Sequence, residues 1–395
     1  MRRRFGDVVF LTYIRKYLNF TIMNRLTILL SGALAAMTMY GAEPDNFFKI
    51  LTSPEVTDTD VTFRIYAPHA TSVAVKGQFM EGTLPMERNP SGIWSLTLPL
   101  PEPDIYPYNF VINDVDVSDP GNPNTFPNET FKASLLEIPG TETLYTVREV
   151  PHGKVHYGTY DSDELGVTRN IIVYTPAEYD ANPIKQYPVL YLISGTTDTE
   201  ETWFKVGRAN TILDNLIATG EAIPMIIVMP YGNMGETPQP SSPEAALMYE
   251  AFSRELTGNI IPYVETYYRT LSGPEHNAIA GFSRGGGQAM YCAFKYPDKF
   301  RWLGSFSAYL TPATLDFFFP DAADTADAMS LLWMSVGTDD FLYPEVVRNK
   351  KYFDDKGIKA TYIERPEQHH TWMHARYCLA ELLKSLFVSE RKKVE

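Results

Sequence analysis

Residues 276–290 read HNAIAGFSRGGGQAM, and they decide the fold of this 395-residue chain. A short apolar run ends at the pentapeptide Gly-Phe-Ser-Arg-Gly, and a run of small, helix-compatible residues follows at once. Gly-x-Ser-x-Gly between a strand and a helix is typical of a nucleophile elbow, a tight turn that holds a serine hydroxyl out above a sheet. Gly281 and Gly285 suit this turn because side chains there would collide with neighbouring backbone. The pattern predicts Ser283 as a nucleophile, with the backbone N–H of Arg284 as a donor to an oxyanion.

Apolar runs alternate with helical patterns through the region around this elbow, which we expect to span residues 149–390. Continuous apolar strands are typical of a sheet that is covered on both faces. The expected strands are 170–174, 189–193, 225–229, 278–280, 302–306, 331–336 and 361–363, and the expected helices are 209–218, 245–268, 286–296, 344–355 and 372–387. The alternation predicts an α/β domain with a doubly wound, mostly parallel sheet, and the nucleophile elbow within it predicts an α/β-hydrolase.

An acid and a histidine follow Ser283 in the order that an α/β-hydrolase triad takes along the chain. Asp339 and Asp340 come directly after one expected strand, and His369 and His370 come after the last one. The histidine would accept the serine proton, and the acid would orient the imidazole and stabilise its charged form. A helix cap for the aspartates and a solvated loop for the histidines are the alternatives. The joint placement after consecutive strands disfavours both.

Residues 1–42 are expected to be a secretory signal region that takes no part in the fold. Arg25 precedes an apolar run, 26–39, that is too short and too rich in small residues for a stable membrane span. Met23 is the expected true start, and cleavage is expected near Ala42. These features predict a secreted or periplasmic protein, with an uncleaved anchor as the alternative.

Residues 46–148 are expected to form a separate all-β module. Short alternating runs broken by Pro, Gly, Asn and Asp are typical of an immunoglobulin-like β-sandwich. Trp94, Tyr106 and Tyr108 could stack on sugar, but aromatic residues in sandwich strands more often pack in the core, which we expect here. The stretch 139–153 is expected to link the two domains, with a last strand at 144–147.

The composition argues against several classes of function. A formal charge of −14 opposes binding to nucleic acid or to an anionic membrane through charge. The two cysteines, Cys292 and Cys378, lie in expected helices, so we expect buried thiols rather than a disulfide. No Cys/His spacing typical of zinc occurs. We therefore expect no metal and no other cofactor.

Two parts of the sequence resemble known families. The runs VTFRIYAPHATSVAVKGQF and GIWSLTLPLPEPDIYPYNFVINDV resemble the early-set, immunoglobulin-like module classed with family 48 carbohydrate-binding modules. The runs GRANTILDNLIATGEAIPMIIVMPYGN, AIAGFSRGGGQAM and GTDDFLY resemble carbohydrate esterase family 1, the feruloyl and acetylxylan esterases, over about residues 150–388. This second resemblance selects His370, which precedes Thr-Trp, and Asp340, which precedes Phe-Leu, as the partners of Ser283. Enterobactin-type siderophore esterases share the fold.

One loop departs from the pattern of this esterase family. Where the family usually has His-Gly-Gly-Gly after the second strand, this chain has Ser194-Gly195-Thr196-Thr197. Because an oxyanion hole uses backbone N–H groups, the N–H of Thr196 can still act beside that of Arg284. The departure bears on the conformation of the loop and on the fit of the substrate.

Two segments are candidates for the rim of a substrate pocket, 232–243 and 310–328. The second segment carries three consecutive phenylalanines. Phe317, Phe319 and Trp372 are the expected contacts of an aromatic acyl group, although a run of three phenylalanines is more often core.

The sequence predicts a secreted serine carboxylic-ester hydrolase. The resemblance implies a plant cell-wall polysaccharide ester as the substrate, with feruloylated xylan as the first expectation. Acetylxylan and an enterobactin-type siderophore are the alternative substrates, and the negative charge disfavours the anionic siderophore. A carbohydrate-binding protein with a degenerate hydrolase domain is the non-enzymatic alternative. The complete set of Ser283, Asp340 and His370 disfavours it, and the altered loop keeps it open.

Overall fold

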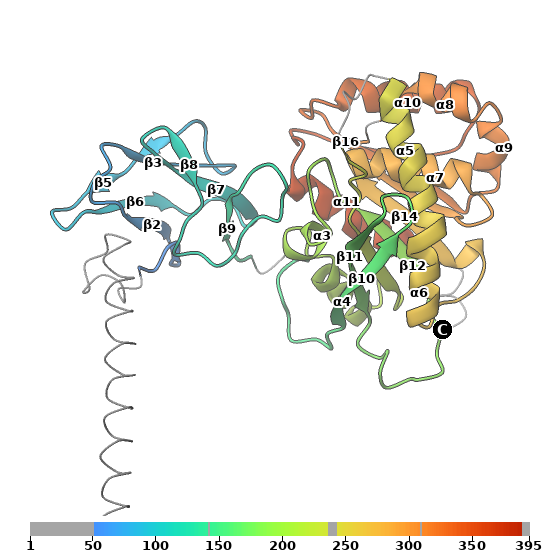
Figure 1. The fold of residues 1–395 in the computed structure, drawn as a ribbon, viewed down its shortest axis with the longest axis horizontal. Coiled ribbons are helices and arrows are strands. Elements are labelled where there is room, and N and C mark those ends of the chain that lie inside the picture. Colours follow the sequence, from blue (N-terminus) through green and yellow to red (C-terminus); the bar gives the residue numbers. More distant parts are fainter. Residues whose placement is uncertain (1–50, 141–142, 236–242, 309, 389–395) are drawn as a thin grey trace, which may run out of the picture.

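The computed structural model describes residues 51–140, 143–235, 243–308 and 310–388. The expected signal region, residues 1–42, lies outside these ranges. Figure 1 shows a smaller part made of strands and a larger part in which helices surround a sheet. No helix in the described ranges combines the length and the apolar character that crossing a bilayer requires.

The smaller part is a β-sandwich of two antiparallel sheets. One sheet has the strand order β1-β2-β6-β5, and the other has the order β4-β3-β7-β8, with β9 also paired to β7. The strands are β1 (Glu55–Val56), β2 (Asp60–Tyr66), β3 (Val73–Gly77), β4 (Leu84–Pro85), β5 (Glu87–Arg88), β6 (Ile93–Pro99), β7 (Ile105–Ile112), β8 (Val115–Val117) and β9 (Ser134–Glu137). Alternation along β2 sends Val61, Phe63 and Ile65 into a core shared by both sheets.

The aromatic residues of the sandwich strands fill its core. Trp94, Tyr106 and Tyr108 are 9%, 7% and 1% exposed. The ring of Tyr108 packs edge-on against that of Phe63, with the centroids 5.0 Å apart. The prediction that these three aromatic residues belong to the core is confirmed.

An eight-stranded sheet organises the larger part, with the order β10-β11-β13-β12-β14-β15-β16-β17. The strands are β10 (Lys154–Ser162), β11 (Val167–Thr175), β12 (Val189–Ile193), β13 (Ile226–Pro230), β14 (Asn277–Phe282), β15 (Trp302–Phe306), β16 (Leu331–Gly337) and β17 (Thr361–Arg365). Pairing is parallel from β13 to β17 and antiparallel at the β10 edge. The central strands are buried throughout because both faces of the sheet are covered.

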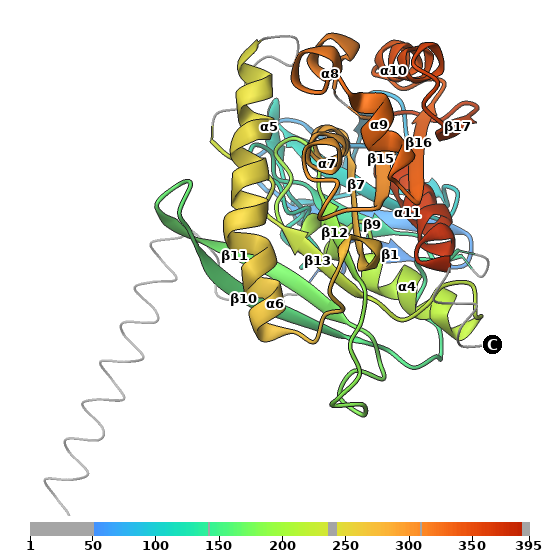
Figure 2. The ribbon, with the colours of Figure 1, turned by 90° about the vertical axis from the view of Figure 1, so that its right-hand side faces the viewer.

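Helices cover both faces of this sheet, as Figure 2 shows. One face packs against α5 (Pro243–Glu255), the π-helical turn η1 (Leu256–Ile260), α6 (Ile261–Tyr267), α7 (Arg284–Lys295), α8 (Pro312–Phe318), α9 (Ala322–Asp327) and α10 (Tyr343–Asp355). The other face packs against α3 (Thr202–Lys205), α4 (Ala209–Ala218) and α11 (Trp372–Ser385), and a 3-10 turn, η2 (Pro274–His276), precedes β14. The fold is therefore an α/β-hydrolase preceded by an immunoglobulin-like β-sandwich, as the sequence predicts.

Two local predictions differ from the structure. The expected strand at 144–147 is wrong, because the chain turns there and the side-chain amide of Asn215 donates to the carbonyls of Leu144 and Thr146, at 2.6 and 3.0 Å. Strand β10 was not predicted. It is an edge strand with mostly exposed or half-buried side chains, so it lacks the apolar run that marks the inner strands.

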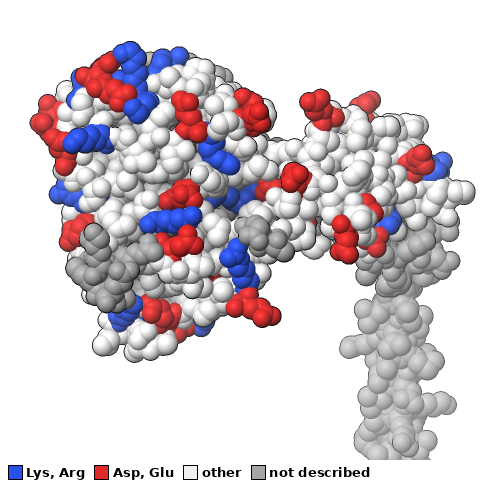
Figure 3. Space-filling view, turned by 180° about the vertical axis from the view of Figure 1, so that it is seen from behind, with Lys and Arg blue, Asp and Glu red and all other residues white. Residues whose placement is uncertain are grey.

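The two parts meet at a buried ion pair. Arg376 on α11 donates to the carboxylate of Asp104 in the sandwich and, at 2.7 Å, to the carbonyl of Val206. Both charged side chains are almost fully buried, at 4% and 3% exposed. In Figure 3, the junction between the parts is narrow, and acidic and basic side chains are interspersed over the face shown.

Arg376→Ala is expected to lower the free energy of unfolding by about 3–5 kcal/mol, because it leaves the Asp104 carboxylate buried without a counterion. Urea denaturation followed by fluorescence measures this change. Arg254→Ala is the matched control, because its ion pair with Glu164 is half exposed and contributes about 1 kcal/mol or less. Equal midpoints for the two variants would contradict the expectation.

Candidate active site

Ser283 lies at the tight turn between β14 and α7. Its φ angle of 82° falls in a region that residues with a side chain rarely adopt. The backbones crowd here, since a Cβ on Gly281 would lie 2.3 Å from the carbonyl of Gly285, and a Cβ on Gly285 would lie 2.3 Å from the oxygen of Ile193. The N–H of Ser283 donates to the carbonyl of Phe306 at 2.9 Å. Backbone contacts on both sides therefore hold the serine in this strained conformation.

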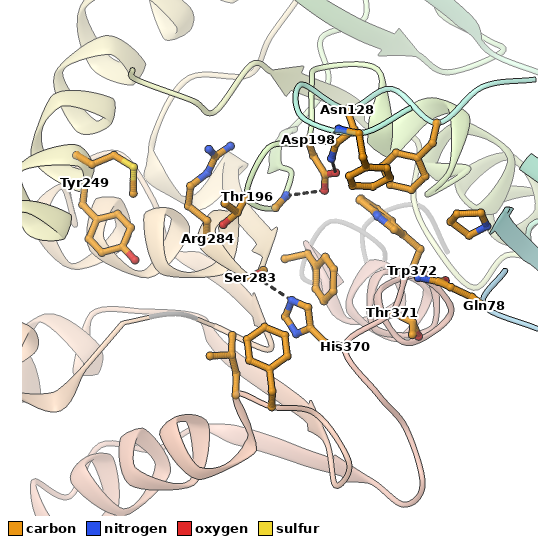
Figure 4. Close-up of a pocket in the computed structure, with 18 residues that line it drawn as sticks. Gln78, Asn128, Thr196, Asp198, Tyr249, Ser283, Arg284, His370, Thr371 and Trp372 are labelled. Carbon is orange, nitrogen blue, oxygen red and sulfur yellow. Dashed lines mark hydrogen bonds between the residues drawn. The ribbon is translucent and has the colours of Figure 1, made fainter. Parts of the chain in front are cut away.

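A chain of hydrogen bonds links Ser283, His370 and Asp340. His370 Nε2 lies 2.9 Å from Ser283 Oγ, as Figure 4 shows. His370 Nδ1 lies 2.8 and 3.0 Å from the two carboxylate oxygens of Asp340. The neighbouring residues face elsewhere, because His369 Nδ1 lies 3.2 Å from the carbonyl oxygen of Asp339 on the exposed side. The structure thus brings together the three residues that the family resemblance selects.

The Asp340 carboxylate is held ionised in a buried position. Burial by itself raises the pKa of Asp340, but the hydrogen bond and charge of His370 and the N–H of Leu342 outweigh it and leave the pKa below its ordinary value. An ionised Asp340 accepts a hydrogen bond from the Nδ1–H of His370, which leaves Nε2 unprotonated and able to accept the proton of Ser283. The imidazole is also held between the rings of Phe282 and Phe341, with centroids 4.5 and 4.6 Å away.

The loop after β12 lies directly against Ser283. A Cβ on Gly195 would lie 3.6 Å from Ser283 Cβ, and Gly195 and Thr196 line the same pocket as the serine. Arg284 opens α7, so its N–H has no partner within the helix. Ser194 Oγ donates to the carbonyl of Thr199 at 3.1 Å, which makes it a turn residue. The loop after β12 and the start of α7 therefore both bring backbone next to Ser283.

The guanidinium of Arg284 is a buried cation behind this loop. The residue is 2% exposed, and its three guanidinium nitrogens have no hydrogen-bond partner in the described structure. Burial lowers the pKa of Arg284 to about 10, against the opposing charges of Asp198 and Glu129. Arg284 is therefore positively charged at neutral pH, and its field favours negative charge next to Ser283.

A cavity of about 430 Å³ opens at Ser283, and both parts of the chain form its walls. The larger part contributes Phe282, Trp372, Phe341, Met248 and Tyr249, and the sandwich and the segment that follows β8 contribute Gln78, Pro107, Phe126, Asn128 and Phe131. Most of these side chains are aromatic or apolar. The cavity therefore suits an apolar, ring-bearing group next to Ser283.

Of the three aromatic residues predicted to contact the substrate, the structure places one in the cavity and two outside it. Trp372 lines the cavity and packs edge-on against Trp203, with the centroids 4.8 Å apart. The prediction for Phe317 and Phe319 is wrong. Phe317 is 79% exposed and lies outside the cavity, and Phe319, which follows the last residue of α8, packs on Tyr291 of α7. The rim segment 232–243 runs partly through 236–242, which lie outside the described residues.

The buried histidine and cysteine side chains outside the cavity pack within the fold. His374 is fully buried on α11, where its Nε2 lies 3.3 Å from the sulfur of Cys378. Cys292 and Cys378 are buried free thiols, as predicted. Among the described residues, no group of three or more His, Cys, Asp or Glu side chains is arranged to hold a metal ion.

His374→Gln is expected to make the protein less sensitive to acid. Burial lowers the pKa of His374 to about 4, whereas the unfolded chain protonates this residue near 6.5. Between about pH 6.5 and about pH 4, the unfolded chain binds a proton on His374 and the folded protein does not. The free energy of unfolding therefore decreases by about 3 kcal/mol as the pH falls through this window. Urea denaturation between pH 7 and pH 4 measures the difference between variant and wild type.

As the pH falls, the free energy of unfolding should therefore decrease less in His374→Gln than in the wild type. His369→Gln is the control, because its ring is exposed. Parallel pH curves for His374→Gln and the wild type would contradict the expectation.

Two family models match the chain. The model described as putative esterase matches residues 162–385, which is more than half of the sequence. The model described as carbohydrate-binding module 48 (isoamylase N-terminal domain) matches residues 40–125. The two matches cover the α/β-hydrolase part and the sandwich.

Two curated relatives are bacterial enzymes with longer chains. The sequence is 28% identical over 333 residues to an endo-1,4-beta-xylanase/feruloyl esterase of Xylanibacter ruminicola, which covers 82% of this chain and 44% of that protein. It is 26% identical over 271 residues to endo-1,4-beta-xylanase Y of Acetivibrio thermocellus, which covers 60% of this chain and 23% of that protein. The chain therefore spans less than half the length of either relative.

Solved structures share the fold at low identity. A CE1 ferulic acid esterase from Anaeromyces mucronatus in complex with ferulic acid matches 64% of this chain and 98% of that chain, with a TM-score of 0.55 and 23% identity. The enterobactin esterase FES from Shigella flexneri matches 88% of this chain and 99% of that chain, with a TM-score of 0.60 and 15% identity. The second likeness extends over both parts of the chain.

Proposed function

This chain belongs to the esterase family, and we propose that it is a secreted serine carboxylic-ester hydrolase that acts on plant cell-wall polysaccharide esters. Release of ferulate from xylan is the reaction that we favour. The observation that carries the proposal is the hydrogen-bonded chain of Ser283, His370 and Asp340 at an aromatic-walled cavity. We further propose residues 1–42 as the signal region, 46–148 as the module and 149–390 as the esterase domain.

In the proposed reaction, Ser283 Oγ attacks the ester carbonyl carbon while His370 Nε2 takes its proton. The carbonyl oxygen becomes an oxyanion, which the backbone N–H groups of Thr196 and Arg284 would bind and the Arg284 cation would stabilise. When the ester C–O bond breaks, His370 returns the proton to the departing alcohol. Water, deprotonated by His370, then attacks the acyl-enzyme and releases the acid and free Ser283.

The size and chemistry of the cavity support an aromatic acyl group over acetate. Acetate would leave most of the 430 Å³ unfilled, whereas a hydroxycinnamoyl group can contact the rings of Phe126, Phe131 and Trp372. The likeness to a xylanase/feruloyl esterase points the same way. The likeness to the enterobactin esterase is one of fold alone and does not carry a second function.

Ser283→Ala is expected to lower kcat/KM for methyl ferulate by about 10³-fold or more, because the nucleophile is lost while the fold remains. Ferulate release is followed by absorbance, and circular dichroism checks the fold. Ser385→Ala is the control, because its hydroxyl only bonds a carbonyl in the last turn of α11. A fully active Ser283→Ala protein would contradict the proposed mechanism.

Phe131→Ala is expected to lower kcat/KM for methyl ferulate about tenfold while changing that for p-nitrophenyl acetate less than twofold. The reason is that only the aromatic acyl group reaches this wall of the cavity, and the loss of one aromatic contact with the substrate costs up to about 1.5 kcal/mol. Phe317→Ala is the matched control, since that ring is also exposed at the surface but does not line the cavity. An equal loss on both esters in Phe131→Ala would argue against the aromatic acyl pocket.

A further inference from the structure

One side chain of the segment between β8 and β9, Asn128, hydrogen-bonds to the loop after β12, residues 194–199, which we call the oxyanion loop. Asn128 is 1% exposed. Its amide Nδ2 donates to Thr197 Oγ1 at 3.0 Å and to the Asp198 carboxylate at 3.1 Å. Its amide oxygen accepts from the N–H groups of Thr130 and Phe131, at 2.9 and 3.3 Å. One buried amide therefore ties the loop beside Ser283 to the segment that carries the aromatic wall.

The backbone around Asn128 adds to this connection. The N–H of Glu129 donates to the carbonyl of Thr197 at 2.8 Å. The carbonyl of Pro127 accepts from the hydroxyl of Thr202 at 2.8 Å. Asn128 and Asp198 also form an isolated antiparallel β-bridge. Residues 127–129 thus run along the oxyanion loop and pair with it as an extra strand would.

The loop needs such support because its own sequence does not supply it. It lacks the His-Gly-Gly-Gly that is usual in carbohydrate esterase family 1. In addition, the β-branched residue Thr197 is held at a φ angle of 63°, which such residues rarely adopt. On the other side of Asp198, the second carboxylate oxygen accepts from the N–H of Gly195 at 3.2 Å. Asp198 therefore connects Asn128 to the residue directly before Thr196.

We propose that Asn128 is a positioning residue for ester hydrolysis: through Asp198 and Thr197 it holds the Thr196 N–H where the oxyanion forms. The amino-terminal module then completes the active site instead of serving only as a site for glycan. The Asn128 side chain is 1% exposed and its amide groups are occupied by hydrogen bonds within the protein, so it has no free polar group to offer a glycan. This inference rests on the proposed function.

The first test compares two buried asparagines of the same module on p-nitrophenyl acetate, which has neither a glycan nor an aromatic acyl group. Asn122 also makes buried hydrogen bonds, to the carbonyl of Leu135 and the hydroxyl of Tyr108, but it lies outside the cavity. Asn128→Ala should lower kcat about 10- to 100-fold with KM changed less than threefold, because misplaced oxyanion donors act on the transition state. Asn122→Ala should destabilise the protein similarly and keep kcat within twofold.

A second pair of variants separates positioning from folding. Asn128→Asp keeps the acceptor contacts to Thr130 and Phe131, but it loses the donors and places a carboxylate beside that of Asp198, near Glu129 and the Arg284 cation. Its kcat should fall at least as far as in Asn128→Ala. Adding Asp198→Asn restores the bond with donor and acceptor exchanged, while the new amide oxygen still accepts from Gly195. The double variant should recover at least tenfold in kcat over Asn128→Asp.

Wild-type kcat in Asn128→Ala, or an equal loss in Asn122→Ala, would overturn the inference while leaving the proposed function intact. Absence of rescue in the double variant, with the fold intact by circular dichroism, would also overturn it. A folded wild-type protein that hydrolyses neither methyl ferulate nor p-nitrophenyl acetate would instead overturn the proposed function, and this inference with it.

Discussion

The close approach of three backbone segments at Ser283 is the constraint on which the rest of the structure depends. A side chain at Gly281 would collide with the backbone of Gly285, and one at Gly285 would collide with the backbone of Ile193. The backbones of β14, β12 and α7 therefore meet at van der Waals distance. This crowding holds Ser283 at a positive φ angle. It also fixes the helix start and the loop after β12 on the same side of the serine, so one packing requirement sets both the nucleophile and its surroundings.

The parts of the fold and of the site that the sequence predicts are those marked by a short pattern of neighbouring residues. Buried parallel strands are continuous apolar runs, and the expected bounds of 189–193 and 302–306 match β12 and β15. The Gly-x-Ser-x-Gly turn and the order of acid and histidine along the chain are also local patterns. The choice of Asp340 over Asp339 needed the family resemblance, because both residues follow the same strand and only the three-dimensional turn decides which one is buried.

The parts that the sequence did not reveal depend on packing between segments far apart in the chain. Asn128 lies in a polar loop without any motif, and its role follows only from contact with Asp198, 70 residues away. Phe131 forms part of the pocket wall for the same reason, whereas Phe319, in the more conspicuous run of phenylalanines, packs on Tyr291. The arrangement makes the active site a joint product of both modules, so the sandwich bears on catalysis through geometry as well as through any glycan that it binds.

The most direct test of the central claim is to locate the covalent bond that the mechanism requires. The protein is treated with an organophosphate ester, which phosphorylates activated serines, and is then digested and mapped by mass spectrometry. The account predicts one phosphoryl group per chain, on the peptide that contains Ser283, with loss of esterase activity in proportion to labelling. Full activity after labelling of Ser283, or inactivation with the label on another residue, would contradict it.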